Sequence, residues 1–172
     1  YAATKRSNEL MAHTFSSLFN LPTTGLRFFT VYGPWGRPDM ALFKFTKNIL
    51  ENKKIDLFNN GNQTRDFVYI DDVVECIILS VSKIPRINRK WFLKKPNPKS
   101  SYCPYRLINI GSDNPTKLST FIRLIEMYLG KKSKQKKLLF QKSDIIKTES
   151  SSQWCYEILK YNLTEINKLV KD

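Results

Sequence analysis

The chain has 172 residues, with 29 Lys and Arg against 15 Asp and Glu and a formal net charge of +14. This length suits one domain or part of one, and a hydrophobic content of 41% argues against wholesale disorder. No apolar run approaches the roughly 20 residues that a membrane span needs, which excludes an integral membrane protein. The positive charge is compatible with an anionic partner but names none.

The chain begins at Tyr1, within a predicted helix, and no basic region is followed by an apolar stretch and a cleavage site. We therefore expect no signal peptide and a fragment whose own N-terminus is missing. Cys76, Cys103 and Cys155 are odd in number and far apart, so we predict neither a disulfide framework nor a metal site. Reduced thiols in the cytoplasm are the expected state.

The first predicted helix covers residues 1–19, where Met11, Phe15 and Leu18 recur at helical spacing and a Leu-Pro pair ends the run. A short buried strand is predicted at 25–29. It is followed by a loop that contains two Gly and two Pro.

That loop covers 31–39, and its last residue, Asp39, is a suitable N-cap for a helix that runs to Leu50. One face of this helix is apolar and carries Leu42, Phe45 and Ile49. The next predicted elements are a strand at 55–58, a turn at 59–62, a strand at 67–70 and a helix opened by Asp71 and Asp72 that runs to about Val81.

Residues 83–106 hold four Pro and many Lys and Arg, and we predict a surface excursion there. A strand at 107–110 and a strongly amphipathic helix at 116–129 follow, with Gly130 as its C-cap. The remaining predictions are a solvated basic loop at 131–137, a strand at 138–140 and short helices at 153–160 and 164–170. Because strands alternate with helices, the fold class is α/β.

Tyr1 and Lys5 lie four residues apart on a predicted helix and therefore share a face. A phenol with an ordinary pKa near 10 is a poor base at neutral pH, but a fixed ammonium beside it favours the phenolate. The pair is thus a candidate acid/base unit. The spacing alone also fits two unrelated side chains on a helix surface.

Two arginines are candidate binding residues for an anionic ligand. Arg65 precedes a predicted strand and suits bidentate phosphate or carboxylate contact, although a surface pair with Asp66 or Asp71 also fits the spacing. Arg37 lies in the Gly/Pro loop, where ligand contacts concentrate.

Other chemistries find little support in the sequence. His13 is the single His, no Ser-His-Asp set is present, and we expect His13 on a helix surface. The six glycines form no dinucleotide or phosphate-binding motif. The basic run lacks interleaved aromatic residues, so we predict no nucleic-acid partner.

Taken in order, four segments resemble the C-terminal half of an extended short-chain dehydrogenase/reductase of the NAD-dependent epimerase/dehydratase family. They are Tyr1-Ala-Ala-Thr-Lys5, Gly25-Leu-Arg-Phe-Phe-Thr-Val-Tyr-Gly-Pro34, Arg65-Asp-Phe-Val-Tyr-Ile-Asp-Asp72 and Asn109-Ile-Gly111. Within that superfamily, Trp35-Gly-Arg-Pro-Asp-Met-Ala41 is similar to the UDP-glucuronate 4-epimerases. The resemblance implies that residues 1–35 are a remnant of the NAD-binding Rossmann domain. It also implies that 36–172 mainly bind a UDP-sugar, with some segments returning to the Rossmann sheet.

The resemblance further implies a mechanism. NAD takes hydride from C4 of the sugar while Tyr1 removes the hydroxyl proton, the 4-keto sugar turns, and hydride returns to its other face. Lys5 bonds the nicotinamide ribose, and Phe28, Val31 and Pro34 border the nicotinamide.

The family pattern also assigns substrate contacts. Arg65 grips the UDP diphosphate, Arg37 meets the uronate carboxylate, Phe58 lies at a strand that flanks the uracil, and Asp144 matches an acidic substrate-binding position. A homodimer formed through the helix that carries the Tyr is a further expectation by analogy.

Some features depart from the family pattern. The glycine-rich Rossmann half and its catalytic Ser or Thr are absent from the sequence, and Gln141-Lys-Ser-Asp144 replaces Gln-Pro-Gly-Asp. Two alternatives therefore stay open beside a cytoplasmic UDP-uronate epimerase. One is a related NAD-dependent nucleotide-sugar decarboxylase or dehydratase, and the other is an inactive basic fragment that binds anionic partners.

Overall fold

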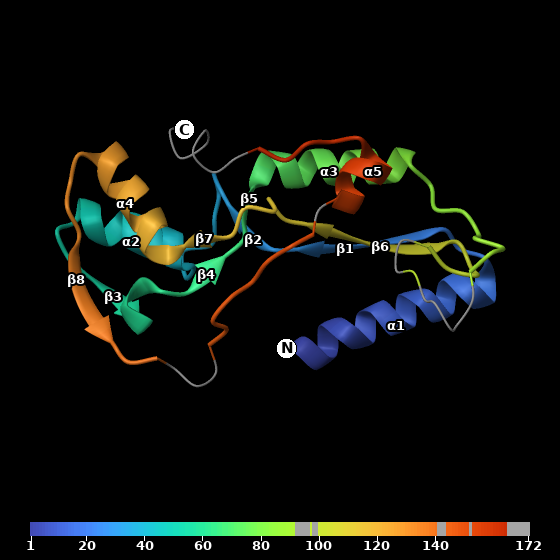
Figure 1. Ribbon diagram of the computed structural model, residues 1–172, viewed down its shortest axis with the longest axis horizontal. Helices are drawn as coiled ribbons and strands as arrows, with labels where there is room; N and C mark the ends of the chain where they lie inside the picture. The colour runs from blue at the N-terminus through green and yellow to red at the C-terminus, as the bar shows by residue number, and fades with distance from the viewer. Residues whose placement is uncertain (92–96, 98–99, 141–143, 152, 165–172) are drawn as a thin grey trace. The chain divides into compact units, whose positions relative to one another are not determined.

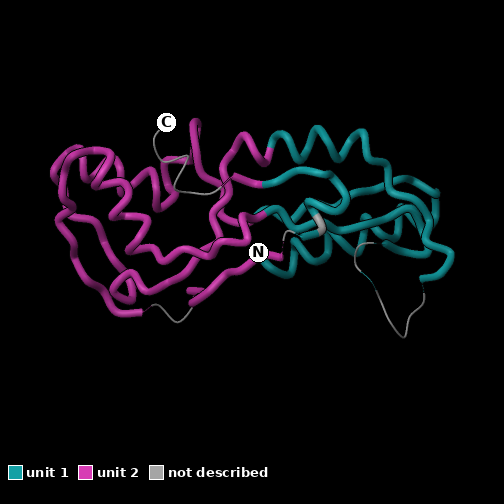
Figure 2. Tube along the Cα trace, turned by 45° about the horizontal axis from the view of Figure 1, so that its top comes forward, with its two compact units in different colours: residues 1–28, 74–110, 152–162 teal, residues 29–73, 111–151, 163–172 magenta. Residues whose placement is uncertain are grey.

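The computed structural model describes residues 1–91, 97, 100–140, 144–151 and 153–164. The chain divides into two compact units (Figure 2). Unit 1 comprises Tyr1–Phe28, Val74–Ile110 and Ser152–Asn162, and unit 2 comprises Phe29–Val73, Gly111–Ser151 and Leu163–Asp172.

Unit 1 is built on two parallel strands, β1 (Thr23–Phe28) and β6 (Tyr105–Ile110), whose register runs from Thr23 opposite Tyr105 to Phe28 opposite Ile110. Helix α1 (Ala2–Phe19) contacts both strands, and the short helix α5 (Gln153–Leu159) contacts β6 (Figure 1). The unit also takes most of α3 (Ile70–Ser82), which begins in unit 2. Parallel strands connected through helices confirm the predicted α/β class.

The apolar stripe predicted on α1 does not face the core of unit 1. Met11, Phe15 and Leu18 are 54%, 56% and 71% exposed, whereas the small Ser16 is buried. The helix is instead tied to the strands by polar contacts, since Glu9 accepts hydrogen bonds from the Arg27 guanidinium at 2.5 and 2.7 Å.

The predicted surface excursion over 83–106 is wrong at its C-terminal end. Ser101, Cys103 and Tyr105 are buried, and β6 begins at Tyr105 rather than at residue 107. His13, expected on a helix surface, is half-buried against this segment, with Nε2 2.8 Å from the Ser101 hydroxyl. Its ring makes edge contacts with the rings of Tyr102 and Tyr105. Residues 92–96 and 98–99 of the excursion lie outside the described residues.

The described residues of unit 2 form three strand pairs. The parallel pairs are β2 (Thr30–Tyr32) with β5 (Phe67–Tyr69) and β3 (Lys54–Phe58) with β8 (Lys134–Leu138), and the antiparallel pair is β4 (Thr64–Arg65) with β7 (Thr116–Lys117). The helical elements that begin in this unit are α2 (Ala41–Leu50), the 3-10 turn η1 (Asn59–Gly61), the start of α3 and α4 (Leu118–Leu129). Helix α2 contacts both β3 and α4.

The core of unit 2 joins the apolar faces of these elements. The Phe67 and Phe121 rings stack with centroids 4.6 Å apart, and Tyr32 packs edge-on against both. Helix α2 contributes Phe45 and Ile49, which confirms the predicted face. The buried members of the core are Tyr32, Phe45, Ile49, Ile55, Leu57, Phe67, Tyr69, Phe121, Ile122 and Ile125.

Several element boundaries differ from the predictions. The N-cap of α2 is Met40, not Asp39, because the Asp39 carboxylate pairs with Arg37. Strand β8 forms within the basic run that was expected to be a loop, and β2 forms at the start of the expected loop 31–39. Gly130 does cap α4 in the left-handed conformation (φ 61°), as predicted. The helix predicted at 164–170 lies outside the described residues apart from its first position.

Candidate functional site

Tyr1 and Lys5 occupy the first turns of α1 in unit 1. Tyr1 is the N-cap residue, and its carbonyl accepts hydrogen bonds from the Thr4 hydroxyl at 2.7 Å and the Lys5 amide at 3.1 Å. The helix thus holds the two side chains on one face, with Lys5 Nζ 5.4 Å from the centroid of the Tyr1 ring. Tyr1 is 93% exposed and Lys5 is exposed, so both polar groups are available to a ligand. Phe28, at the end of β1, is exposed in the same unit.

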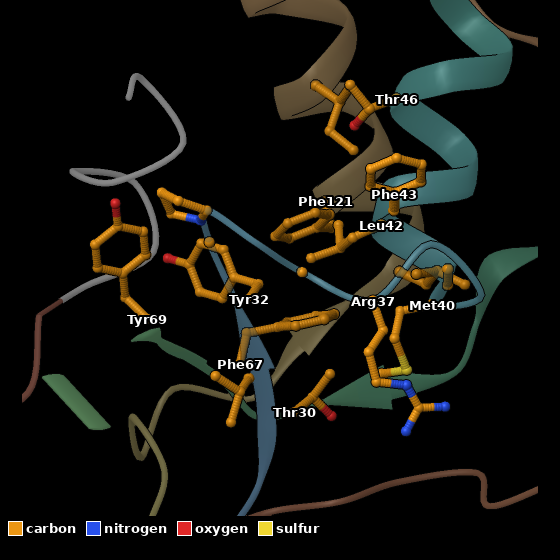
Figure 3. A pocket seen from close by; sticks show the side chains of 17 residues that line it. Thr30, Tyr32, Arg37, Met40, Leu42, Phe43, Thr46, Phe67, Tyr69 and Phe121 are labelled. Atoms are coloured by element: carbon orange, nitrogen blue, oxygen red, sulfur yellow. The ribbon is translucent and has the colours of Figure 1, made fainter. Parts of the chain in front are cut away.

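Unit 2 contains a cavity of about 500 Å³ with a mostly apolar lining (Figure 3). Val31 of β2 and Pro34 of the following loop line it, together with Arg37. The aromatic part of the wall is formed by Tyr32, Phe43, Phe67, Tyr69 and Phe121. An apolar cavity with a few polar groups at its edge is the usual form of a small-molecule site.

The hydroxyl of Tyr32 is buried in this unit and makes no hydrogen bond within the described part of the chain. Burial, followed by the negative charge of Asp72, raises the pKa of Tyr32 well above its ordinary value. Tyr32 is therefore a neutral phenol at neutral pH and can donate a hydrogen bond, but it cannot act as a base.

Gly33 lets the chain turn sharply where β2 meets the loop. Its φ is +130°, a conformation that side-chain-bearing residues rarely adopt, and a Cβ there would lie 2.6 Å from Ile70 Cγ2 and 2.9 Å from Tyr69 Cε2. The glycine therefore allows the loop that carries Pro34 and Arg37 to leave the strand close to the end of β5.

Arg37 lies in this loop and is exposed. Its Nε donates to Asp39 Oδ1 at 3.0 Å, and a second guanidinium nitrogen pairs with Asp39 Oδ2. Figure 3 shows the Arg37 side chain at the edge of the cavity, on the other side from Tyr69. Because this ion pair is open to solvent, it leaves the guanidinium able to exchange partners.

Arg65 and Asp144, far apart in the sequence, are brought together in unit 2. Arg65 donates to Asp144 Oδ1 at 2.8 Å and to the Thr64 carbonyl at 3.0 Å, and its side chain is 20% exposed. The buried Gln63 donates from Nε2 to Asp144 Oδ2 at 2.7 Å. The surface pairing with Asp66 or Asp71 that the spacing allowed is not formed, because Asp144 provides the partner.

Asp66 follows Arg65 and has a structural role. Its side chain is fully buried, and one carboxylate oxygen accepts hydrogen bonds from the Ser112 amide and hydroxyl at 2.6 and 2.8 Å. The other oxygen accepts from the Ser150 amide at 3.0 Å and from the Ser150 hydroxyl. The Asp66 carboxylate therefore connects the segments that contain Ser112 and Ser150 to the chain directly before β5.

Phe58 ends β3, is half-buried, and lies opposite Leu138 of β8 in the parallel register. Sequence reasoning missed Gln63, Tyr32 and Tyr69 as residues of this region. The two tyrosines lie within the Tyr-Gly-Pro and Asp-Phe-Val-Tyr segments, which could have pointed to them. Gln63 carries no motif signal. Among the described residues, no group of three or more His, Cys, Asp and Glu is arranged to hold a metal ion.

Residues 1–90 match the NAD dependent epimerase/dehydratase family, and the chain belongs to that family. Protein CapI of Staphylococcus aureus is 56% identical over 148 residues, which are 86% of this chain and 44% of that protein. The probable UDP-glucuronate 4-epimerase of Rhizobium meliloti is 45% identical over 153 residues, which are 88% of this chain and 45% of that protein.

A solved structure of similar fold is the UDP-glucuronic acid 4-epimerase from Bacillus cereus in complex with UDP-glucuronic acid and NAD. It is 28% identical, with a TM-score of 0.80, and the match covers 98% of this chain and 49% of that one. The chain therefore spans about half the length of the relatives it matches.

Proposed function

We propose that the full-length protein is an NAD-dependent enzyme that epimerises C4 of a UDP-uronate and interconverts UDP-glucuronate and UDP-galacturonate. The observation that carries the proposal is the exposed Tyr1–Lys5 pair on one face of α1. The substrate class is supported by relatives described as UDP-glucuronate 4-epimerases.

In this proposal Tyr1 is the acid/base group. Its phenolate accepts the proton of the sugar C4 hydroxyl and returns a proton to that oxygen after the ring has turned. The helix places Lys5 on the same face as Tyr1, with Nζ 5.4 Å from the centroid of the Tyr1 ring. General acid–base help of this kind contributes about 10²–10⁴-fold in rate.

The residues of this chain fit a nicotinamide cofactor. Lys5 has three N–H donors for ribose hydroxyls, and its side chain is exposed, with Nζ 5.4 Å from the centroid of the Tyr1 ring. Phe28, Val31 and Pro34 would border the nicotinamide with apolar surface. NAD, when bound, supplies the hydride acceptor and donor at C4.

Arg65 and Asp144 would bind the nucleotide. A guanidinium has five N–H donors, so Arg65 can keep its contact with Asp144 and still meet a diphosphate. The second contact of Asp144, from Gln63, holds the carboxylate that positions Arg65. Phe58, which is half-buried at the end of β3, would flank the uracil.

Arg37 would pair with the C6 carboxylate of the uronate. Its present partner, Asp39, is a solvent-exposed carboxylate in the same loop, so the substrate carboxylate would replace it with the same charge pairing. A 4-keto acid tends to lose carbon dioxide, and an arginine that holds the carboxylate in place would oppose that loss.

Three further parts of the proposal concern the whole protein. Residues 1–35 would complete the NAD-binding domain, and residues 36–172 would mainly bind the UDP-sugar. The pairing of β6 with β1 supports the proposal that some segments of 36–172 return to the sheet of the NAD-binding domain.

Homodimerisation through α1 is supported by its exposed apolar side chains. Among the described residues, no helix has the length and apolar character needed to cross a membrane. We propose a cytoplasmic location because the substrate class and the thiol-bearing chain suit it.

Product analysis of the full-length protein with UDP-glucuronate tests the function. Wild type should yield UDP-galacturonate. Replacement Arg37→Ala should lower kcat/KM for UDP-glucuronate by about 10–100-fold, the scale of a lost charged hydrogen bond, while binding of UDP itself changes little. The control Lys47→Ala removes the same charge from an exposed position of α2 outside the cavity and should leave turnover unchanged.

The products separate the alternatives. A UDP-pentose as the main wild-type product would establish the decarboxylase alternative, and no conversion of any nucleotide sugar would favour the inactive basic protein. Full epimerase activity in the Arg37→Ala variant would remove Arg37 from the substrate site.

A further inference from the structure

Two of the three cysteines meet in the core of unit 1. Cys76 lies on α3 and Cys155 on α5, and their Sγ atoms are 3.4 Å apart. Both side chains are completely buried. The two residues are far apart in the sequence, so the contact exists only because α5 packs beside α3.

The separation places the two sulfur atoms in van der Waals contact. A disulfide bond is about 2.05 Å long, so the sulfurs need to approach by about 1.4 Å. Helix α5 has only seven residues, and a small shift of such a short helix can supply that approach. Cys103, the third cysteine, lies instead beside His13 and Ser101, at 3.5 Å from each.

We propose that Cys76 and Cys155 form a modification site, a dithiol that a peroxide converts into a disulfide. The first thiol, as thiolate, attacks the peroxide oxygen and becomes a sulfenic acid while water leaves. The second thiol attacks that sulfur, the S–S bond forms, and a second water leaves. The two sulfurs together lose two electrons, and hydrogen peroxide gains them as it is reduced to two molecules of water.

A peroxide suits this site because access is limited. Hydrogen peroxide is not much larger than water, and it can reach a buried pair when the short helix α5 opens locally. Once one cysteine has become a sulfenic acid, the partner sulfur is already in contact, so disulfide formation outruns further oxidation.

The disulfide would fasten the C-terminal part of the chain to α3. A second contact already serves this purpose, because Thr164 donates from its amide and hydroxyl to Asp72 at 2.8 and 2.9 Å. Asp72 precedes Cys76 by one helical turn on α3. The covalent link encloses a long loop of chain, which is the arrangement that stabilises most in the loop-entropy description of disulfides.

Peptide mapping of the full-length protein tests the proposal. Trypsin places the three cysteines on three different peptides, residues 66–83, 100–106 and 148–160. After treatment with millimolar hydrogen peroxide and alkylation of remaining thiols, we expect peptides 66–83 and 148–160 to be linked by a disulfide. The link should disappear on reduction, and Tm should rise by about 3–10 °C in the oxidised protein.

Variants make the assignment specific. Cys103→Ser should form the same link and show the same rise in Tm, whereas Cys155→Ala and Cys76→Ser should show neither. Unlinked or over-oxidised peptides 66–83 and 148–160 in wild type would overturn the proposal, and so would a link from either of them to 100–106. A linked pair without a rise in Tm would overturn the stabilising role of the link.

Discussion

Arg37 and Arg65 illustrate how the surroundings of a side chain decide its use. Arg65 is largely buried and is held by a carboxylate and a carbonyl from different segments. Arg37 is exposed and pairs with Asp39, two residues further along its own loop. A ligand would therefore find Arg65 already oriented, whereas binding at Arg37 requires a change of partner. We expect the first arginine to contribute to affinity for any UDP compound and the second to distinguish between sugars.

The Tyr1→Phe variant of the full-length protein removes only the phenol oxygen. We expect turnover to fall by at least about a hundredfold, because in the proposed function proton transfer at C4 would lose its acid/base group. NAD should remain bound, since one hydroxyl is a small part of its contacts. Cofactor content and the rate of UDP-glucuronate conversion measure the two effects, and near-normal conversion would reject Tyr1 as the base.

Asp66→Asn tests the buried carboxylate that fastens two segments of unit 2. The amide group would turn N–H donors toward the Ser112 or Ser150 amide, so at least one buried donor would lose its acceptor. We expect the variant to lose about 2–4 kcal/mol of unfolding free energy in urea denaturation. Asp71→Asn, at an exposed position of α3, is the matched control and should cost less than about 1 kcal/mol.

Helix α1 is joined to β1 by a charge pair that is sensitive to acid. The Arg27 guanidinium holds the pKa of Glu9 below its ordinary value of 4.5, mainly through their hydrogen bonds. A carboxyl group with a lowered pKa stabilises the folded state above its unfolded pKa and loses that contribution as the pH falls. Because Arg27 is partly exposed, the contribution should be at most about 1 kcal/mol.

Denaturation of wild type and Glu9→Gln between neutral pH and about pH 3 tests this pair. Wild type should be the more stable protein at neutral pH, and the difference should shrink below about pH 4.5. Glu51→Gln removes a carboxylate whose partner, Lys53, is in solvent, and should change stability little at any pH. A difference between wild type and Glu9→Gln that stays constant with pH would contradict the role of the Glu9 charge.

The elements that sequence patterns predicted are those whose own residues carry the signal. Helices α2 and α4 present apolar stripes, and the Phe45 and Phe121 side chains on them are buried as expected. Strand β8 has no such signal, since four of its five residues are Lys or Gln and exposed. It forms because β3, whose Ile55 and Leu57 are buried, provides a backbone partner. Strands defined by a distant partner are beyond local pattern reasoning.

In the candidate site too, features carried by local sequence motifs were predicted and contacts between distant residues were not. The resemblance selected both Arg65 and Asp144, but nothing in the sequence predicted that they would bind each other, because that contact depends on the path of the chain between them. Gln63 escaped notice for the same reason, since its role is to contact Asp144. The expected N-cap function of Asp39 was wrong because a nearby arginine competes for the carboxylate.

For the molecule as a whole, the exposed apolar surface predicts how residues 1–172 behave when expressed alone. Unit 1 exposes large apolar side chains on α1 and α3, including Leu18 and Val81. Such surface usually contacts another part of a protein, so we expect poor solubility or a loosely packed state. Size-exclusion chromatography and thermal unfolding, with the full-length protein as control, test this. A monomer with a sharp cooperative transition would show that residues 1–172 fold stably without a further part of the protein packed against these apolar side chains.

The strand pairing has a consequence for the time course of folding. In the register of the parallel pairs, Thr23 meets Tyr105 and Lys54 meets Lys134, so each early strand must wait for a partner that the ribosome makes much later. Chains with such a high contact order fold slowly, because loop closure costs entropy before the distant contacts form. During synthesis β1 and β3 therefore lack these two partners for an extended period, and in this interval the nascent chain is more exposed to aggregation and has more need of chaperones.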